Sequence, residues 1–301
     1  MKRAYLVVIA ALVLSIGANA MNLNVYCGQK LFSPNSINAA LKLLNPQGPN
    51  TLSVFGTCNE NVLIQGFDRL TLIGKRGATI NDASGGTGFV VDVEDSTDIE
   101  IQGFTIKGGV IGVMCSNFSV CRFDGNTVQG ASVAGIQLGQ SRASFGANTI
   151  QNNGTGLVVL ESSSVRTFGG MIIQANQGDG VNVDTNGSFA SFGDTIQNNG
   201  NNGIASYNRG SVLLLGTTIT GNSATGVLMV AQSTADFELN NVVTGNAYGV
   251  LVKDVSYAEF RGPNTVTGNW TGTDVYCQPQ FPATRGALTN IGGGTTNCVE
   301  P

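Results

Sequence analysis

Apolar and polar positions recur along this chain with a period of about 23 residues. The clearest part of the repeat is a glycine followed by apolar residues at alternate positions, as in Gly249-Val250-Leu251-Val252. It occurs at Gly88, Gly112, Gly135, Gly156, Gly180, Gly203, Gly226, Gly249 and Gly272. Alternation is typical of a β-strand, and about three short strands fit into one period. A repeat that cannot bury its own apolar face must stack on its neighbours, so the pattern predicts an all-β parallel solenoid with one continuous core.

Two further columns support the same architecture. An aromatic residue or leucine recurs at Phe123, Phe145, Phe168, Phe192, Leu215, Leu239 and Phe260, and asparagine recurs at Asn153, Asn176, Asn199, Asn222, Asn246 and Asn269. Like residues stack on like at about 4.8 Å from coil to coil. We expect the glycines and asparagines to occupy tight corners with positive φ, and the asparagine side chains to bond along their column. The asparagine column is therefore interpreted as structural. Helical repeats, the competing architecture, do not fit a sequence dominated by β-branched residues and glycine.

The ends of the repeat differ from its middle. Residues 36–44 carry apolar side chains on one helical face, with Ser36 as a candidate cap, which predicts a helix that covers the N-terminal end of the core. We divide the chain into a leader (1–20), an N-terminal cap with the first coils (21–84), regular coils (85–276) and a C-terminal cap (277–301).

The first twenty residues are typical of an export signal. Lys2 and Arg3 precede an apolar run from Leu6 to Ile16, and Ala18-Asn19-Ala20 matches a small-residue cleavage site. We expect cleavage after Ala20 and a secreted protein, either periplasmic or extracellular; a membrane anchor is the alternative. The rest of the chain has no uninterrupted apolar stretch of about 18 residues, so no later segment is expected to span a membrane.

Composition narrows the possible partners and the redox state. The formal net charge is −4, and the leader contributes two of the positive charges, so a nucleic-acid partner is not expected. An even number of cysteines in an exported chain predicts disulfides. Nearest neighbours give the pairs Cys27 with Cys58, Cys115 with Cys121, and Cys277 with Cys298. Metal binding by the cysteines is the weaker alternative, because the chain has no CxxC motif and no histidine.

The repeat over residues 85–276 resembles the right-handed parallel β-helix repeat proteins, which share the pectate-lyase-like fold. Ser36-Ile-Asn-Ala-Ala-Leu, Thr57-Cys-Asn-Glu-Asn-Val-Leu-Ile and Leu72-Ile-Gly resemble the N-terminal cap and first coils of such proteins. The resemblance implies a right-handed coil, and a possible polysaccharide substrate, because the family includes pectate lyases, polygalacturonases, pectin methylesterases and alginate epimerases. Other members, such as phage tailspikes, differ in function, so the function must be argued from a site.

The catalytic motifs of these enzymes are missing. The chain contains no histidine, no Asp-Asp dipeptide and no Gly-Asp-Phe-Ile-Phe-Gly motif. Whether the protein is an enzyme stays open; if it is one, a polysaccharide lyase or a glycoside hydrolase is expected. A glycosidase needs two facing carboxylates, and several pairs qualify.

One column of outward positions carries candidate binding residues. It lies four residues after each repeated glycine and includes Asp184, Tyr207, Lys253 and Tyr276. Two aromatic rings, a carboxylate and a cation in a line would hold a sugar chain by stacking and hydrogen bonds. The alternative is an ordinary solvent-exposed face.

Acidic and basic clusters are the remaining candidates. Asp92 and Glu94 share a strand face, and their oxygens are possible ligands for Ca²⁺; the alternative is a solvated acidic surface. Arg142, Arg166, Arg209 and Arg261 recur at intervals of about one or two coils, which suggests a basic strip for a polyuronate, although Asp236 and Glu259 occupy the register of Arg166.

Three functional hypotheses follow from these patterns. The leading one is a secreted protein that binds polysaccharide along its coil surface, with or without cleaving it. The first alternative is a non-enzymatic structural or adhesive surface protein. The second is a calcium-dependent polysaccharide lyase with an atypical site. The oligomeric state is not predicted by any of these patterns.

Overall fold

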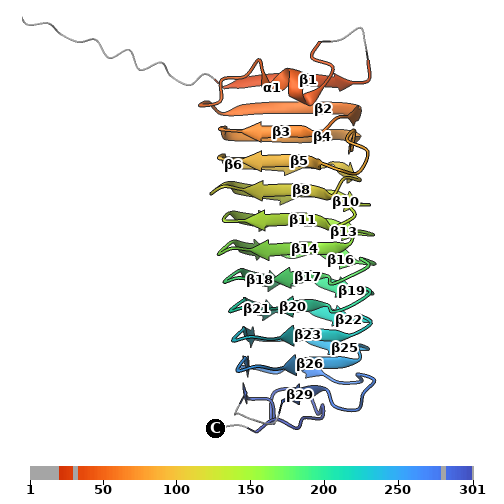
Figure 1. The fold of residues 1–301 in the computed structure, drawn as a ribbon, viewed down its shortest axis with the longest axis vertical. Helices are drawn as coiled ribbons and strands as arrows, with labels where there is room; N and C mark the ends of the chain where they lie inside the picture. Colours follow the sequence, from red (N-terminus) through yellow and green to blue (C-terminus); the bar gives the residue numbers. More distant parts are fainter. Residues whose placement is uncertain (1–19, 30–32, 279–282, 300–301) are drawn as a thin grey trace, which may run out of the picture.

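Short strands separated by tight corners wind into a stack of coils, so that each strand pairs in parallel with the equivalent strand one coil away (Figure 1). The computed structural model describes residues 20–29, 33–278 and 283–299. The predicted parallel solenoid is confirmed. The leader predicted for residues 1–20 lies outside the described residues, apart from Ala20.

The strands form a 20-stranded sheet, sheet A, and a 10-stranded sheet, sheet B. The first arm of sheet A consists of β1 (Met21–Cys27), β2 (Asn50–Asn59), β4 (Asp68–Asn81), β6 (Thr97–Gln102), β9 (Val120–Asp124), β12 (Arg142–Phe145), β15 (Ser164–Thr167), β18 (Ser188–Phe192), β21 (Ser211–Leu215), β24 (Thr234–Phe237), β27 (Tyr257–Phe260) and β30 (Thr284–Arg285). Its second arm, which joins the first through β4, consists of β7 (Thr105–Lys107), β10 (Thr127–Gln129), β13 (Thr149–Gln151), β16 (Ile172–Gln174), β19 (Thr195–Gln197), β22 (Thr218–Thr220), β25 (Val242–Thr244) and β28 (Thr265–Val266).

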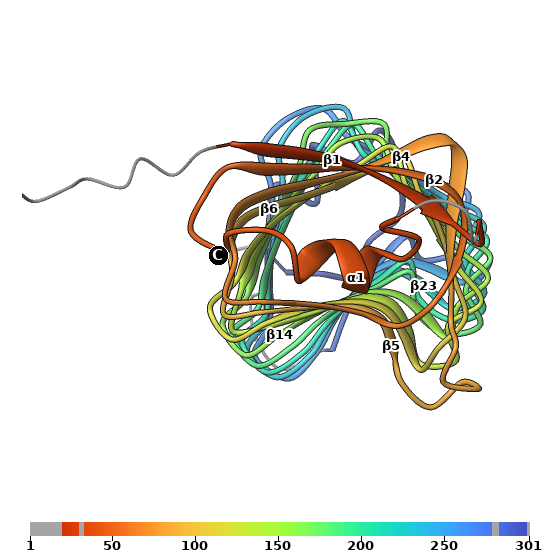
Figure 2. The same ribbon diagram turned by 90° about the horizontal axis from the view of Figure 1, so that it is seen from above.

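Sheet B lies across the core from the first arm of sheet A (Figure 2). Its strands are β3 (Val62–Gln65), β5 (Phe89–Glu94), β8 (Ile111–Ser116), β11 (Ala134–Gly139), β14 (Thr155–Leu160), β17 (Val181–Val183), β20 (Ile204–Ser206), β23 (Thr225–Met229), β26 (Tyr248–Val252) and β29 (Val275–Cys277). Alternate residues of these strands point inward, as predicted for Val250 and Val252, which are both buried.

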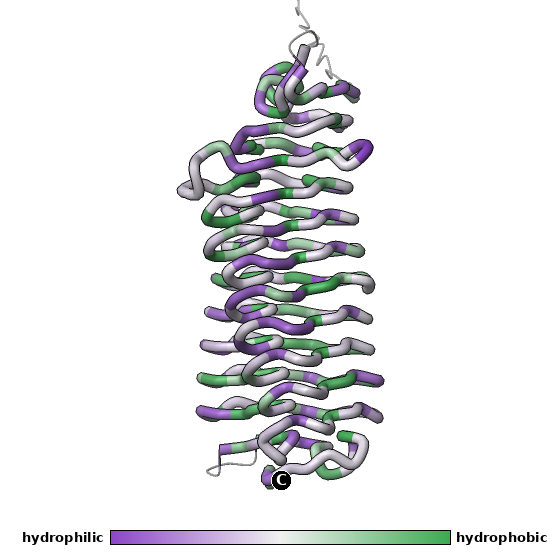
Figure 3. Tube along the Cα trace, turned by 90° about the vertical axis from the view of Figure 1, so that its right-hand side faces the viewer, coloured by the Kyte–Doolittle hydropathy of each residue, from purple (hydrophilic) through white to green (hydrophobic). Residues whose placement is uncertain are grey.

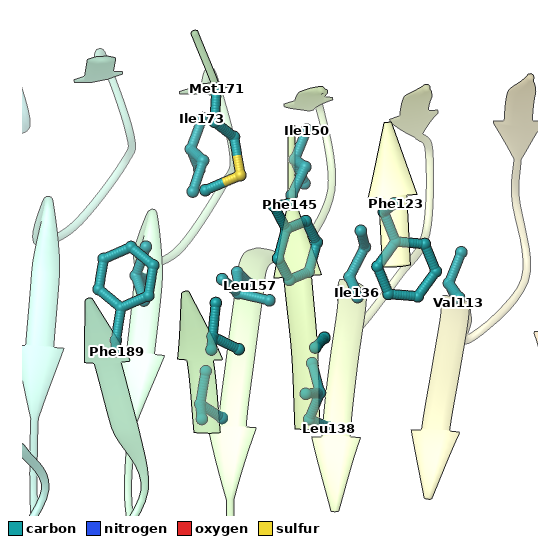
Figure 4. Close-up of a cluster of buried hydrophobic side chains, with 14 of the residues drawn as sticks. Val113, Phe123, Ile136, Leu138, Phe145, Ile150, Leu157, Met171, Ile173 and Phe189 are labelled. Carbon is teal, nitrogen blue, oxygen red and sulfur yellow. The ribbon is translucent and has the colours of Figure 1, made fainter. Parts of the chain in front are cut away.

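Stacked apolar columns fill the interior. Phe123 and Phe145 are paired in register, and their rings lie 5.1 Å apart (Figure 4). The predicted aromatic column is wrong from Phe168 to Leu239, because Phe145 pairs with Thr167, and Phe168 points outward with 67% of its surface exposed. A slip of one residue along a strand moves a side chain to the other face. Phe192, Leu215 and Leu239 are also partly or largely exposed, whereas Leu214 and Phe237 continue the inner column to Phe260.

The asparagine column forms the predicted hydrogen-bond ladder. Nδ2 of each asparagine donates to Oδ1 of the asparagine one coil further on, at 2.9–3.2 Å, through Asn153, Asn176, Asn199, Asn222, Asn246 and Asn269. The last acceptor is the carboxylate of Asp274, at 2.9 Å. A parallel ladder of Gln129, Gln151, Gln174 and Gln197 runs along the second arm, where hydrophilic segments recur in successive coils (Figure 3).

The expected positive φ falls elsewhere in the corner. The ladder asparagines have ordinary backbone angles, and positive φ occurs one residue earlier, for example at Asn152 (56°), Ala175 (53°) and Gly221 (66°). The repeated glycines from Gly112 to Gly249 do not have positive φ either. They are glycines because a Cβ atom would collide with the next coil: at Gly180 it would lie 2.6 Å from the carbonyl oxygen of Gly203 and 2.8 Å from Nδ2 of Asn199.

A short helix covers the N-terminal end of the stack. The helix α1 (Ile37–Leu41) is shorter than the predicted 36–44 and lies across the N-terminal end of the core (Figure 2). Ser36 caps it by accepting a hydrogen bond from the Ala39 amide, and Glu60 accepts from the amides of Ile37 and Asn38. The three predicted disulfides, Cys27–Cys58, Cys115–Cys121 and Cys277–Cys298, are confirmed.

Candidate functional site

The outward face of sheet B brings three of the predicted binding residues into one column. Asp184, Tyr207 and Lys253 directly follow β17, β20 and β26. Their backbone amides continue the parallel ladder, because each donates to the carbonyl of the preceding coil, at Val159, Val183 and Met229 respectively. All three side chains are partly exposed. The sheet therefore presents a carboxylate, a phenol and an ammonium group along one line.

Tyr276 does not belong to that column. It pairs with Leu251, two residues before Lys253, and therefore lies in the neighbouring outward column, which also contains Leu228 and Asp92. The predicted column was counted from Gly272, but two additional residues in the corner before β29 shift the register. The ring of Tyr276 packs against Tyr248, with their centroids 5.7 Å apart and their planes inclined by 51°.

Tyr248 and Trp270 are aromatic residues of this region that the repeat did not reveal. Tyr248 begins β26, at a position that is alanine or threonine in several other coils. Trp270, the single tryptophan of the chain, lies in the corner that leads into β29 and is 67% exposed. Its amide donates to the carbonyl of Asn246, two residues before Tyr248. We call Tyr207, Tyr248, Trp270 and Tyr276 the aromatic group of sheet B. Tyr248 and Trp270 could have been found in the sequence as aromatic residues that lie outside the periodic apolar positions.

Negative charge surrounds Tyr207. Asp184 accepts hydrogen bonds from the Thr185 amide at 2.6 Å and from Nδ2 of Asn208 at 2.7 Å, which hold its carboxylate in place. The pKa of Tyr207 is raised above its ordinary value of 10.0 by partial burial, and further by the carboxylates of Asp179 and Asp184. The phenol therefore stays protonated at neutral pH and remains a hydrogen-bond donor.

Asp92 and Glu94, the candidate calcium ligands, form a close carboxyl pair on β5. Asp92 lies between Leu63 and Met114 of the neighbouring coils, so its Oδ1 atom is buried and has no hydrogen-bond partner within the described residues. Burial, together with the charge and a hydrogen bond of Glu94, raises the pKa of Asp92 to about 7. Calcium takes 6–8 oxygen ligands, and apolar neighbours supply none, so water would have to complete the coordination. A calcium ion here stays a prediction.

The carboxyl pair should make stability depend on pH. Folded protein keeps a proton on Asp92 that unfolded protein, with a pKa near 3.8, has released. Stability should therefore fall as the pH rises from about 4 to about 7, by roughly 1–2 kcal/mol once solvent screening is allowed for. Asp92→Asn should remove this loss and be the more stable protein at pH 8. Urea unfolding at pH 5 and pH 8 measures it, with Asp98→Asn as the exposed control; equal losses in both variants would contradict the assignment.

The four arginines do not form a basic strip. Arg209 lies in a turn, where it donates to Gln232, and Arg261 is held among Asp236, Glu238 and Glu259. Asp236 and Glu259 do stand in the register of Arg166, as expected. Among the described residues, the group of three metal-ligating side chains that approach within 4.8 Å is Cys27, Cys58 and Glu60, and its two cysteines are disulfide-bonded.

Three solved structures with a similar fold come from enzymes. The chain is similar to the A-module of the Azotobacter vinelandii mannuronan C-5 epimerase AlgE4, with 16% identity over 79% of this chain and 82% of that one and a TM-score of 0.53. The AlgE6 A-module of the same organism gives 17% identity over 84% and 83% and a TM-score of 0.54. Pectate lyase Pel9A gives 13% identity over 95% and 79% and a TM-score of 0.58.

These identities are low enough that the similarity shows the fold alone. No curated protein matches the sequence. The family model described as the right-handed beta helix region matches residues 134–284, which is half of the chain. The chain therefore belongs to the right-handed β-helix family.

Proposed function

We propose that this protein is exported and binds a polysaccharide on the outward face of sheet B, at its C-terminal end. The observation that carries the proposal is the aromatic group of sheet B. Aromatic rings bind the apolar faces of sugar rings, and their polar tips hydrogen-bond to hydroxyl groups. The tilted pair of Tyr248 and Tyr276 offers such rings on a rigid sheet, beside the exposed Trp270.

Polar groups next to these rings suit sugar hydroxyls. Asp184 accepts hydrogen bonds and Lys253 donates them, and Tyr207, between their coils, does both. An extended polymer parallel to the coil axis would meet all three in turn, because consecutive coils lie about 4.8 Å apart. The names of the similar structures give independent support, since mannuronan and pectate, the polymers in those names, are both polysaccharides.

Export is supported by the three disulfides, which persist in oxidising compartments such as the periplasm and the extracellular space. Within the described residues, no helix has both the length and the apolar character needed to cross a bilayer. The predicted signal at residues 1–20 would deliver the chain to such a compartment.

Tyrosine substitutions test the binding face. We expect Tyr207→Ala and Tyr276→Ala each to weaken binding about 3- to 10-fold, because each removes one stacking surface without disturbing the core. Isothermal titration of the exported form with a panel of neutral and acidic polysaccharides measures the affinity. Tyr257→Ala, on the opposite face of the stack, is the matched control.

Two results would contradict the proposal. One is the absence of binding to every polymer of the panel, and the other is an affinity that neither tyrosine variant changes. The same panel, assayed for the release of reducing ends in the presence of Ca²⁺, separates binding from cleavage. Release from one polymer class would identify the protein as an enzyme and would fix the class of its substrate.

A further inference from the structure

Four Asn-x-Ser/Thr triplets occur in the chain. They begin at Asn117, Asn153, Asn186 and Asn269. A triplet of this kind, with any middle residue except proline, is the acceptor sequence for N-linked glycosylation. The sugar is attached to the asparagine amide, and the hydroxyl two residues later is required for recognition. The surroundings of these two groups therefore decide which triplet of a folded chain can be modified.

Two of the asparagines belong to the buried ladder. Asn153 is 0% exposed and Asn269 is 7% exposed. Their Nδ2 atoms donate to Oδ1 of Asn176 at 3.1 Å and to Oδ1 of Asp274 at 2.9 Å. A sugar on either nitrogen would place a large polar group in the core, where it has no hydrogen-bond partners. We therefore attribute these two triplets to the ladder, which places asparagine in every coil.

The triplet of Asn117 is blocked at its hydroxyl. Asn117 is exposed, but Ser119 is 0% exposed. The Oγ atom of Ser119 accepts from the amide of Ser96 at 3.1 Å and donates to the carbonyl oxygen of Val93 at 3.4 Å. Ser141 repeats this arrangement one coil further on, because its Oγ accepts from the Ser119 amide. The required hydroxyl is thus enclosed in a ladder of serines.

The triplet of Asn186 has both groups on the surface. Asn186 lies in the turn between β17 and β18, with a φ of 61°, and it is exposed. Its backbone amide donates to the carbonyl of Asn208, but its side-chain amide makes no hydrogen bond within the described residues. Ser188 begins β18 and is partly exposed, and its hydroxyl has no partner in the described part of the chain. An enzyme can therefore reach both groups while the coils stay folded.

A carboxylate two residues before the asparagine further distinguishes this triplet. Asp184 occupies that position before Asn186, whereas the other three triplets have Cys115, Gln151 and Thr267 there. The side-chain hydrogen bonds of Asp184 are all accepted by Oδ1, so Oδ2 has none among residues 20–29, 33–278 and 283–299. This oxygen offers a contact to a cationic side chain of a modifying enzyme.

We propose that Asn186 carries an N-linked glycan. The proposal rests on the export proposed above, because the chain meets the transferase as it leaves the cytoplasm. The glycan donor is a lipid-linked oligosaccharide pyrophosphate. The Nδ2 atom of Asn186 forms a bond to the anomeric carbon of the first sugar, and the bond between that carbon and the pyrophosphate oxygen breaks. The lipid pyrophosphate leaves with the electron pair, and the nitrogen loses one proton.

The fold leaves room for the glycan beside this turn. A groove follows the turns that connect sheet B to the first arm of sheet A, from the coil of Asn186 toward the C-terminal coils. It is lined by Thr185, Asn186, Asn208, Arg209, Ala231, Gln232, Asp254 and Val255. Its polar side chains can form hydrogen bonds with the hydroxyl groups of the first sugars. The glycan would therefore lie along this corner and cover the neighbouring turns.

Peptide mass spectrometry tests the site directly. Trypsin places the four triplets on separate peptides, residues 108–122, 143–166, 167–209 and 262–285. In reduced, digested protein secreted by its own host, we expect a glycan mass on peptide 167–209 alone. Asn186→Gln and Ser188→Ala should each remove it, whereas Ser188→Thr, which keeps the hydroxyl, should retain it. Asn117→Gln is the matched control and should leave the glycan in place.

Other results would contradict the proposal in distinguishable ways. A chain that has lost residues 1–20 but has an unmodified peptide 167–209 would overturn the glycan and leave the proposed export standing. A chain that retains residues 1–20 would overturn both. A glycan on another triplet in place of Asn186 would show that burial does not select the site. Loss of the glycan from Ser188→Thr as well as from Ser188→Ala would contradict the role of the hydroxyl, provided that the thermal midpoints show both variants to be folded.

Discussion

Asn199→Leu should lower the free energy of unfolding by about 3–5 kcal/mol. The side chain of Asn199 is 1% exposed and donates to Oδ1 of Asn222, while its own Oδ1 accepts from both the backbone amide and Nδ2 of Asn176. Leucine has the same branched shape and is larger, so it fills the space, but it leaves these donors and acceptors unpaired in the core. An unsatisfied buried polar group costs about 1–3 kcal/mol, and this substitution leaves several.

Unfolding in guanidinium chloride measures this loss of stability, and Gln197 in the same coil provides the control. Gln197 belongs to the glutamine ladder and donates to Gln174 at 2.9 Å, but this ladder is partly exposed, so water replaces the lost bonds. Gln197→Ala should therefore cost less than about 1 kcal/mol. A similar cost for both substitutions would mean that the buried ladder contributes no more to stability than a surface one.

Gly203→Ala should destabilise the protein by about 3 kcal/mol or more through a single added methyl group. The new Cβ would lie 2.5 Å from Cγ2 of Ile219, 2.7 Å from the carbonyl oxygen of Gly226 and 2.9 Å from Nδ2 of Asn222. Two of these atoms belong to the backbone or to the ladder, so neither can move without disturbing the next coil. The substitution overpacks the point in this coil where the chain entering β20 passes the asparagine ladder.

Gly139→Ala is the matched control for this prediction. Gly139 is the last residue of β11 in sheet B and, like Gly203, has no positive φ. An added Cβ would be 3.6 Å from Cε of Met114 and 3.8 Å from Oε2 of Glu161, which are ordinary contacts. Thermal unfolding of the two variants should show a large decrease in the midpoint for Gly203→Ala and almost none for Gly139→Ala. Equal midpoints would show that the coils can separate enough to admit the methyl group.

The repeat predicted the fold because a period of about 23 residues with alternating apolar positions has few other physical solutions. It also predicted the asparagine ladder, because those residues recur at a spacing that stacking explains. The disulfides were predicted separately, from the even number of cysteines in a chain expected to be exported and from nearest-neighbour pairing. The family match and the parallel register agree with these predictions. The average period could not predict the exact length of each individual coil.

Corner lengths decide which side chains reach the surface. Asn246 and Asn269 are 23 residues apart in the ladder, but Val250 pairs with Val275, because the corner before β29 holds two additional residues. That insertion displaced Tyr276 from its predicted column, and Trp270 lies in the same corner. A one-residue variation likewise turned Phe168 outward. Corners tolerate changes in length because their residues face solvent. The alternation of apolar residues within the strands therefore does not reveal how long each corner is.

The direction of the asparagine ladder has a consequence for how such a protein changes length during evolution. In the coils between Asn153 and Asn269, each ladder asparagine accepts hydrogen bonds from the preceding coil. It donates the same kind of hydrogen bonds to the following coil. A duplicated coil would therefore satisfy both neighbours wherever it is inserted, whereas a partial coil would leave polar groups unpaired. Asp274, fixed by Thr295, accepts the last bonds of the ladder and must remain at its end. Duplication and loss of whole coils upstream of this carboxylate should thus be the route by which the family varies its length.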